Sequence, residues 1–474
     1  MTTIAAEPRI SRALAAFVAS TGADDLPPAV MEEATRATLD WLGSALAGAL
    51  EPPARMVQQF VRGLGLSDEA ALLPEGRASA AGAALANGTS SHILELDDLH
   101  KGSTLHPAAP IIPAALAAAE REWAGGRRLL HAIVLGYEAA LRIGEAVNPS
   151  HYRFWHPTGT AATFGAAVAA GVILGLDEGQ MLDALGSAGT QAAGLWEFNA
   201  DGAMSKHLHP GKAAFNGILS ADLARSGFTG ATRILEGERG FFRAMSADYD
   251  AARITEGLGT TWKIAENSYK LHSCCGHTHS AIDAALDLRE RLGWTDGEAA
   301  RQAAQVHITT YGPGYEIVRE SRPRTPYQAK FSLAYCVAIA LLEGRVGLAQ
   351  FDPARFDANG PRDPAVRELL ARTGIEVDPD LSARYPACWP ARLEVRLADG
   401  PAIEASVDYP RGTPENPVPT GTLEQKFRDL VAPHYGAGTA ERAIEAVRAL
   451  DTCPDVSALM RDLLSGAQAH RTGG

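Results

Sequence analysis

Apolar residues recur at intervals of three and four positions along most of the N-terminal half of the chain. This spacing is typical of helices that bury one face. It predicts helices at residues 29–50, 79–95, 110–122, 129–147, 161–175, 179–194 and 211–227. Many of their apolar positions are Ala or Gly, which lets neighbouring helices approach closely. This part of the chain is therefore predicted to form an all-α bundle.

The pattern changes beyond residue 270. Three runs there are rich in β-branched and aromatic residues, which predicts strands at 306–311, 393–397 and 403–409. Asp399-Gly400 lies between the last two runs and is a turn dipeptide suited to a hairpin. Helical spacing then returns at 422–432 and 437–464.

These patterns predict a mainly α protein with an α+β second domain. The large helical domain is expected at 1–270, with 410–474 packing back on it, and the smaller α+β domain at 271–409. A chain of 474 residues with 46% apolar composition is long enough to bury a large core in two domains.

Composition excludes several classes of partner. The net charge is −13 and no block of Lys and Arg occurs, so neither nucleic acid nor an anionic membrane surface is expected to bind. No apolar run reaches the roughly 20 residues of a membrane span, and no signal-like N-terminus is present, which predicts a cytoplasmic protein. Five cysteines without framework spacing agree with a reducing compartment and no structural disulfide.

Acidic and imidazole side chains gather after the predicted helix 79–95. The group contains His92, Glu95, Asp97, Asp98, His100, Ser103 and His106. A magnesium or calcium site would need several oxygen ligands close together, whereas the adjacent aspartates point to different sides and histidines are not ligands for hard cations. Solvation of a helix end is another interpretation. The interpretation we favour is an acid/base or substrate-positioning site.

Two further segments carry candidate residues. His156 precedes a helix of small residues that Thr158 or Thr160 could cap, and a helix N-terminus attracts anions. A histidine merely hydrogen-bonded into a loop is the alternative. Lys206 lies in a predicted loop, between histidines and glycines, and a surface lysine is the alternative there.

The run from Tyr269 to His279 contains two adjacent cysteines and three histidines, together with Lys270. Structural zinc sites usually combine two separated pairs of ligands, and adjacent cysteines chelate one ion poorly. A polar turn leading into a helix near Ser280 is therefore favoured over zinc. Cys275 as a nucleophile would need a base, and no base is assigned to it.

These stretches, taken in order, resemble the MmgE/PrpD family, which includes 2-methylcitrate dehydratase, cis-aconitate decarboxylase and iminodisuccinate epimerase. The resemblance runs along nearly the whole chain. It is carried by Leu39-Asp40, Ala47-Gly48, Asn87-Gly88, Asp97-Asp98, His106-Pro107, Gly136-Tyr137-Glu138, Gly165-Ala166-Ala167, Lys206, Gly211, Leu235-Glu236-Gly237, Tyr269-Lys270, Ala329-Lys330-Phe331-Ser332, Tyr335, Arg411-Gly412 and Asn416-Pro417.

The resemblance implies an all-α domain made from both chain ends, a smaller α+β lid, a cofactor-free pocket between them, and a homodimer. It places family active-site positions on Glu95, Leu99, His106, His156, Lys206, Lys270, Cys275 and Tyr335. Leu99 departs from the threonine of the dehydratase and decarboxylase branches. Cys275 stands where the decarboxylases carry a histidine, although His277 and His279 leave the register open. Both departures argue against aconitate or 2-methylcitrate itself as the substrate.

The chemistry that the resemblance implies is proton transfer at a carbon next to a carboxylate. Such a carbanion needs cations, here Lys206 and Lys270, and a proton shuttle, for which His106 and His156 are expected, with Tyr335 as a further donor. Substrate contacts are predicted at Glu95, Asp97, Asp98, Ser103, Lys270, His272, Cys275 and His277.

We expect a lyase without metal or cofactor that acts on a small di- or tricarboxylate, with dehydration preferred over decarboxylation. Two alternatives remain open at this point. One is an epimerase or isomerase of an amino- or iminodicarboxylate, in which two facing acids exchange one proton. The other is a non-catalytic relative that binds a carboxylate, a metal or a partner protein.

Overall fold

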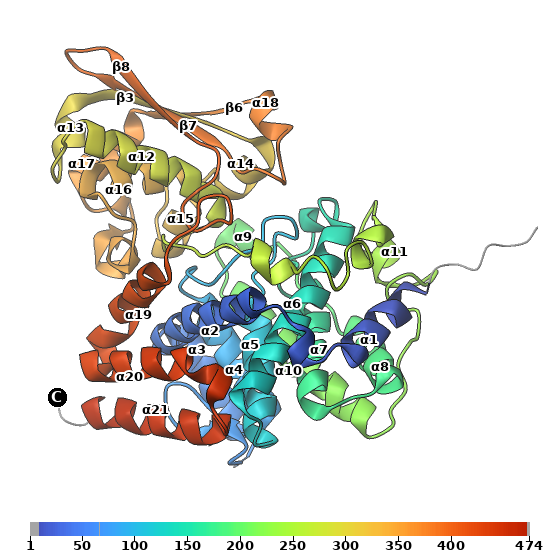
Figure 1. Cartoon of the computed structure of the whole chain (residues 1–474). Coiled ribbons are helices and arrows are strands. Elements are labelled where there is room, and N and C mark those ends of the chain that lie inside the picture. Colours follow the sequence, from blue (N-terminus) through green and yellow to red (C-terminus); the bar gives the residue numbers. More distant parts are fainter. Residues whose placement is uncertain (1–8, 66, 472–474) are drawn as a thin grey trace, which may run out of the picture.

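The computed structural model describes residues 9–65 and 67–471 and shows a large helical body and a smaller body built around a sheet (Figure 1). The predicted fold class, mainly α with a smaller α+β part, is confirmed. The outermost residues of the predicted segments 1–270 and 410–474 lie outside the described residues. Within the described ranges, every helix is too short or too polar to cross a membrane.

The helical body takes its helices from both ends of the chain. Its N-terminal part contains α1 Ile10–Ser20, α2 Pro28–Gly48, α3 Pro52–Gly63, α4 Ala80–His92, α5 Ala108–Arg121, α6 Gly126–Val147, α7 Ala161–Leu174, α8 Glu178–Gly189, α9 Phe198–Asp201, α10 Ser205–Arg225 and α11 Phe241–Met245, with the short pair β1 Ala70–Ala71 and β2 Arg77–Ala78. Its C-terminal part contains α19 Thr420–Tyr435, α20 Ala437–Arg448 and α21 Val456–Arg471. Helix α19 packs beside α2, and this contact brings the N-terminal and C-terminal parts of the chain together in one body (Figure 1).

Small residues allow the central helices α4, α6, α7 and α10 to pack closely. A Cβ on Gly211 of α10 would lie 2.2 Å from the carbonyl oxygen of Leu85 in α4. A Cβ on Gly217 would lie 2.5 Å from the Cβ of Ala166 in α7. Larger residues at these crossings would force the helices apart. The Ala and Gly content seen in the sequence therefore brings α4 and α10, which flank the candidate site, into direct contact.

The sheet body contains four main strands in the order β6-β3-β7-β8. Its strands are β3 Ala303–Thr310, β6 Thr373–Val377, β7 Ala391–Leu397 and β8 Ala402–Val407, with the short pair β4 Phe356–Asp357 and β5 Gly360–Pro361. Its helices are α12 His279–Arg291, α13 Glu298–Gln302, α14 Gly312–Val318, α15 Pro326–Lys330, α16 Leu333–Glu343, α17 Pro364–Ala371 and α18 Pro379–Ser382. Helix α12 packs against β7 and β8, and α16 packs against α12.

The register of the sheet follows from its burial pattern. Ala391, Leu393 and Val395 of β7 are buried while the residues between them are more exposed, as expected for a strand with one covered face. The hairpin predicted at Asp399-Gly400 is confirmed by the antiparallel pair β7–β8. The edge strand β6 pairs parallel with β3 and was not predicted, because its sequence, Thr-Gly-Ile-Glu-Val, is short and alternates apolar and polar residues only over its last three positions.

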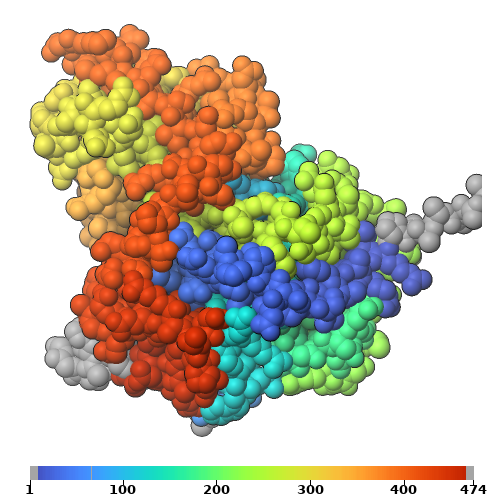
Figure 2. Space-filling model, viewed as in Figure 1, coloured from blue at the N-terminus to red at the C-terminus, as the bar shows by residue number. Residues whose placement is uncertain are grey.

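Each body has its own hydrophobic core. The core of the helical body draws on residues 10–269 and 418–464, and the core of the sheet body on residues 274–407. The chain passes between the bodies twice, in the segments around 270–273 and 408–417. Figure 2 shows the smaller body, in yellow and orange, standing on the helical one.

Three predicted helices differ from the structure, and the first two differences matter for the site. The helix predicted at 79–95 ends at His92, so Glu95 lies in the following loop. The helix predicted at 211–227 begins at Ser205, so Lys206 occupies its first turn and not a loop. The helix predicted at 437–464 is interrupted by a 3-10 turn at Leu450–Thr452 and forms α20 and α21.

Candidate active site

A small closed pocket lies between the two bodies. Its walls are Glu95, Leu99, Thr104, His106, Tyr152, His156, Trp196 and Lys206 of the helical body and Cys275, Gly276, His277, Phe331 and Trp389 of the sheet body. The volume of this pocket is only about 20 Å³, which is room for about one water molecule. A dicarboxylate therefore does not fit in this pocket in the conformation described.

Residues 93–107 form the loop that carries most of the charged wall. Glu95 and Thr104 have φ angles of 58° and 49°, in the left-handed region that side chains other than Gly rarely adopt. Such strain persists only where the surroundings enforce it, and it concentrates at functional sites. The loop therefore presents Glu95 and Thr104 to the pocket in a conformation that the surrounding contacts must hold.

Glu95 is held between two ammonium groups. Lys206 of α10 donates a short hydrogen bond to one carboxylate oxygen, and the Nζ of Lys270 lies 3.4 Å from the other. Burial alone would raise the pKa of Glu95, but Lys206 and Lys270 lower it well below its usual range. Burial works against the charge of Lys270, whose pKa is nevertheless raised by Glu95 and Asp97. The arrangement keeps Glu95 and Lys270 ionised inside the protein.

His106 is a neutral imidazole with one nitrogen committed to the backbone. Its Nδ1 lies 2.6 Å from the carbonyl oxygen of Asp98, so Nδ1 carries the proton and Nε2 is the acceptor. Burial lowers the pKa of His106 to about 3, and the charge of Lys270 acts in the same direction against that of Asp97. His106 therefore offers a lone pair to the pocket in the free protein.

His156 lies in a cluster of imidazole rings. Its Nδ1 is 3.1 Å from the Nδ1 of His209, so one ring donates to the other. Burial, followed by the neighbouring His209, lowers the pKa of His156 well below its usual range. The ring of His92 lies 4.9 Å from that of His106 and 5.5 Å from that of His156. His92 in turn bonds to Asp97 at 2.6 Å.

The sheet body closes the pocket with a thiol and an aromatic wall. Burial raises the pKa of Cys275 to about 12, so the group is a thiol and no candidate nucleophile at neutral pH. His277 stacks on Trp389 at 4.2 Å between ring centroids, and its Nδ1 lies 2.5 Å from the hydroxyl oxygen of Tyr311. The Nε2 of His277 lies 3.5 Å from the hydroxyl of Tyr152, which links the two bodies across the pocket.

Several residues predicted to serve the site have other partners. The carboxyl of Asp98 accepts hydrogen bonds from Tyr137 at 2.7 Å, Asn267 at 2.8 Å and the backbone N–H of Ala108 at 3.0 Å. Burial raises the pKa of Asp98 to about 8. Asp98 does not line the pocket, and its contacts tie the loop to α5 and α6. Asp97 also lies behind the pocket wall, bonded to His92.

His272 and Tyr335 likewise lie outside the pocket walls. His272 bonds to Asp283 of α12 at 3.0 Å. Tyr335 donates to the carbonyl oxygen of Gln350 at 2.6 Å and packs on Phe351 in the core of the sheet body. The hydroxyl of Tyr335 is thus bonded inside the core of the sheet body, and its role as a proton donor to the site stays a prediction.

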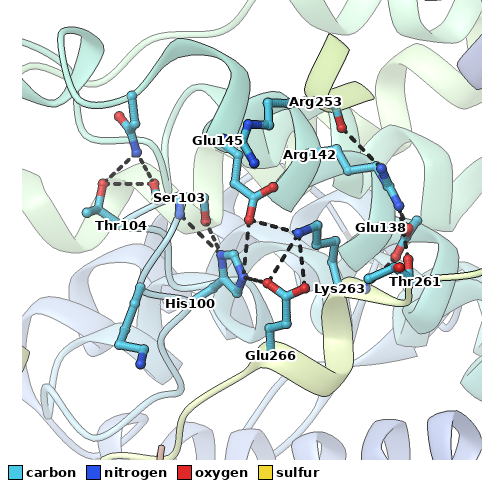
Figure 3. Close-up of polar contacts among 12 residues, drawn as sticks. His100, Ser103, Thr104, Glu138, Arg142, Glu145, Arg253, Thr261, Lys263 and Glu266 are labelled. Carbon is cyan, nitrogen blue, oxygen red and sulfur yellow. Dashed lines mark hydrogen bonds and ion pairs between the residues drawn. The ribbon is translucent and has the colours of Figure 1, made fainter. Parts of the chain in front are cut away.

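Ser103 belongs to a separate polar network on the other side of the loop (Figure 3). Its hydroxyl bonds to Nδ1 of His100 at 2.9 Å. The Nε2 of His100 faces Glu266 at 3.4 Å and Glu145 at 3.7 Å, and the Nζ of Lys263 lies 3.0 Å from each of these carboxylates. Ser103 thus anchors the loop and does not face the pocket.

Two groups of side chains in the described ranges lie close enough to share a metal ion. In the group His100, Glu145 and Glu266, the ammonium of Lys263 already bonds to both carboxylates. In the group His92, Asp97 and His106, the Nδ1 of each histidine is hydrogen-bonded, to Asp97 and to the Asp98 carbonyl respectively. The segment Cys274–His279 does not supply a third group of this kind among the residues that the structure describes. It forms the predicted polar turn, Gly276–Thr278, before α12.

Sequence reasoning missed the aromatic walls and one buried cation. Tyr152, Trp196 and Trp389 line the pocket, and no pattern in their neighbours distinguishes them from core aromatics. Lys330 donates to the carbonyl oxygen of Leu94 at 2.9 Å, and burial lowers its pKa to about 8. Lys330 belongs to the family-like motif Ala329-Lys330-Phe331-Ser332, and that motif was the available signal that it lies close to Glu95.

Comparison with known proteins identifies the class. The family model described as the MmgE/PrpD N-terminal domain matches residues 12–253, and the MmgE/PrpD C-terminal domain matches residues 272–452. The chain belongs to the MmgE/PrpD family.

Individual relatives add detail. A "Cis-aconitate decarboxylase-like protein oryM" of Aspergillus oryzae is 29% identical and covers 97% of this chain and 98% of its own. The cis-aconitate decarboxylase of Homo sapiens is 28% identical, over 91% of this chain and 89% of its own. A "2-methylcitrate dehydratase-like protein oryR" of Aspergillus oryzae is 28% identical over 35% of this chain and 34% of its own.

Proposed function

We propose that this protein is a metal-independent lyase that acts on a small di- or tricarboxylate by proton transfer at a carbon next to a carboxylate. The observation that carries the proposal is the neutral His106, whose free Nε2 shares a closed pocket with the Glu95–Lys206 ion pair. A base beside fixed cations is what formation of a carboxylate-stabilised carbanion requires. The names of the family relatives are those of lyases of such acids.

The ammonium groups have donors to spare for a substrate. An ammonium carries three N–H donors, and Glu95 takes one from each of Lys206 and Lys270. A substrate carboxylate can accept from the remaining donors, and its negative charge then raises the pKa of the nearby His106 and His156 from their low values in the free protein. Substrate binding would thereby convert these weakly basic imidazoles into effective proton acceptors.

Decarboxylation is the outcome we favour among the lyase reactions. Relatives with decarboxylase names match more than nine-tenths of the chain, whereas the dehydratase-like relative matches 35% of it. The pocket also has apolar walls in Leu99, Phe331 and Trp389, and an apolar environment favours conversion of a carboxylate into neutral CO₂. When the carbon–carbon bond to CO₂ breaks, the carbanion takes a proton from His106 or His156, whichever ring has been protonated with the substrate bound. The preference for dehydration drawn from the sequence is thus replaced by decarboxylation as the first candidate.

Dehydration and epimerisation remain specific alternatives. The ring centroids of His106 and His156 are 6.4 Å apart, so one imidazole can remove a proton while the other protonates a departing hydroxyl or returns the proton to the opposite face. A panel of citrate, 2-methylcitrate, cis-aconitate and iminodisuccinate followed by NMR in D₂O distinguishes the reactions. Release of CO₂ supports the proposal, and net loss of water selects dehydration. Deuterium exchange without net product selects epimerisation, and no change in any acid contradicts the proposal.

Access to the pocket is proposed to require movement of the sheet body as a lid, with residues 271–409 as the moving part. The closed pocket has room for about one water, and closure around substrate excludes water from the carbanion. Hydrogen exchange with and without a dicarboxylate tests this: both 95–106 and 270–279 should be protected on binding. Protection of one segment alone at saturating ligand would place the ligand away from the interface between the bodies.

The homodimer implied by the family resemblance remains a proposal as well. Light scattering on the purified protein measures it directly. A mass of one chain across micromolar concentrations would contradict it.

A further inference from the structure

A surface groove approaches the pocket from the side of α14 and α15. It has a volume of about 410 Å³ and is lined by Asn199 and Gly202 of the helical body and by Ile317, Tyr327 and Phe331 of the sheet body, among others. Phe331 also lines the closed pocket. The groove and the pocket are therefore neighbours that share one side chain, and the volume of the groove is in the range of small-molecule sites.

Tyr327 stands where the groove meets the pocket. Its ring packs against Phe331 at 5.1 Å and edge-on against His207 at 5.8 Å between centroids. Phe331 in turn lies 5.0 Å beneath the ammonium of Lys206. A Cβ on Gly202 would lie 3.0 Å from the ring of Tyr327, so the opposite wall of the groove closes directly on this side chain.

The hydroxyl of Tyr327 is buried and has no hydrogen-bond partner in the described part of the chain. The Nδ1 of His207, which is also buried, is unpartnered there too. Buried polar groups normally have partners, and leaving one unsatisfied costs stability. Burial raises the pKa of Tyr327 well above its usual value, and the charge of Glu95 acts in the same direction. The hydroxyl therefore remains a proton donor within electrostatic reach of the pocket.

We propose that Tyr327 is a specificity-determining residue whose hydroxyl donates a hydrogen bond to the substrate carboxylate that lies farther from the reacting carbon, at the junction of groove and pocket. The proposal rests on the proposed function for the location of the reacting carbon. It explains the unpartnered donor, since a bound carboxylate supplies the missing acceptor. A protein without ligand then carries the cost of the unsatisfied hydroxyl, and the ligand relieves it.

The test compares Tyr327→Phe with wild type in binding and in turnover. Calorimetry with citraconate, a dicarboxylate, should show an affinity lower by about 10-fold to 100-fold, the effect of one hydrogen bond to a charged group. Binding of crotonate, a monocarboxylate, should change less than about twofold, because it has no second carboxylate for the hydroxyl. With any acid that wild type converts, KM should rise while kcat stays within about threefold.

A second readout separates binding from structure. Removal of an unsatisfied hydroxyl should leave the Tm unchanged or higher, whereas loss of a structural hydrogen bond would lower it. Tyr249→Phe is the matched control, since Tyr249 is 42% exposed and stacks on Phe242 away from the groove. It should change neither affinity nor Tm.

The outcomes distinguish this proposal from the proposed function. Unchanged citraconate affinity in Tyr327→Phe, or an equal loss for citraconate and crotonate with a lower Tm, overturns the role of Tyr327 alone. Binding without turnover of any acid by wild type overturns the lyase, while the two affinities still decide the role of the hydroxyl. Failure of wild type to bind citraconate or any acid of the panel overturns both.

Discussion

Two clusters of carboxylates, imidazoles and ammonium groups flank the same loop, residues 93–107, and one of them contributes Glu95, His106 and Lys206 to the pocket walls. On one side, Lys206 and Lys270 hold Glu95 beside His106; we call this set the pocket cluster. On the other side, Lys263 bridges Glu145 and Glu266 next to His100; we call this set the buried network (Figure 3). Their composition is nearly the same, so residue types alone do not separate catalytic groups from structural ones.

The difference lies in how many polar atoms have protein partners. His100 uses both ring nitrogens, one with Ser103 and one with Glu266. Within the described ranges, the ring of His106 hydrogen-bonds through Nδ1 alone, and His106 lines the pocket. A satisfied network stabilises a loop, whereas an incompletely satisfied one has capacity left for a ligand. Changes in the pocket cluster should therefore reduce turnover, and changes in the buried network should reduce stability.

The largest effect is expected from the ammonium groups. Lys206→Ala should reduce kcat/KM by about 100-fold to 1000-fold, because a developing carbanion loses a charge-stabilising donor. It also leaves Glu95 with Lys270 as its remaining cation. The double variant Lys206→Ala with Glu95→Gln should therefore recover thermal stability without recovering turnover. Steady-state kinetics and thermal unfolding measure the two effects.

Lys263→Met is the matched change in the buried network. It should lower the free energy of unfolding by about 1–3 kcal/mol, because the mostly buried Glu145 loses its cation, whereas Glu266, 42% exposed, stays solvated. At the same time, kcat/KM per folded molecule should change less than about tenfold. Near wild-type turnover of Lys206→Ala would remove Lys206 from the mechanism. Equal losses of turnover in both variants would erase the distinction between the two clusters.

The next effect contrasts the imidazoles. His106→Ala should reduce kcat by about 100-fold or more, since it removes the acceptor nitrogen, with a small change in Tm. His100→Ala should instead lower Tm by several degrees and leave kcat within about tenfold, because it breaks the bonds to Ser103 and Glu266. The acid panel and differential scanning fluorimetry provide both numbers. A His106→Ala variant with a lower Tm but an unchanged kcat would reverse the assignment.

The sequence predicted more of the fold than of the site. Helical spacing located α2, α4–α8 and α19, and the Asp-Gly turn located the β7–β8 hairpin, because these signals are local. Glu95, His106, His156, Lys206 and Lys270 do converge in the structure. Their sequence separation exceeds 170 positions, so family-like order, and not spacing, carried that expectation.

Two of the predicted site residues have partners away from the pocket in this structure. Tyr335 and Ser103 carry hydroxyls suited to a site, but Gln350 and His100 bond them elsewhere. Tyr152 and Trp389, which do line the pocket, resemble ordinary core aromatics in the sequence. Whether a hydroxyl faces the pocket or bonds to a neighbour depends on how the surrounding loop and helix fold, and the residue type alone does not specify that.

A smaller effect concerns pH. Burial lowers the pKa of His106, His207 and His277 to about 3, whereas in the unfolded chain these histidines titrate near 6.5. Below pH 6.5 the unfolded state binds more protons, so the free energy of unfolding should fall as the pH drops, by about 1.4 kcal/mol per pH unit for each such histidine. The stability is complete above pH 6.5.

Urea unfolding at pH 7.5, 6.5, 5.5 and 4.5 measures this slope. His277→Phe, which keeps a ring to stack on Trp389, should reduce the slope by the contribution of one histidine. His307→Gln is the control, because His307 lies at the surface of the sheet with its side chain 37% exposed. An identical slope in wild type and His277→Phe would mean that His277 is not held neutral by burial.

The smallest expected effect is that of removing metal ions. Three potential ligands meet at each of two places: His92, Asp97 and His106 beside the pocket cluster, and His100, Glu145 and Glu266 in the buried network. In the first, hydrogen bonds already hold the Nδ1 of both histidines; in the second, Lys263 bonds to both carboxylates. Exhaustive chelation should therefore leave kcat/KM unchanged. Added Zn²⁺ should inhibit, because it competes for the acceptor nitrogen of His106. Stoichiometric metal by elemental analysis, with activity lost on chelation and restored by that metal, would show instead that the pocket cluster works as a metal centre.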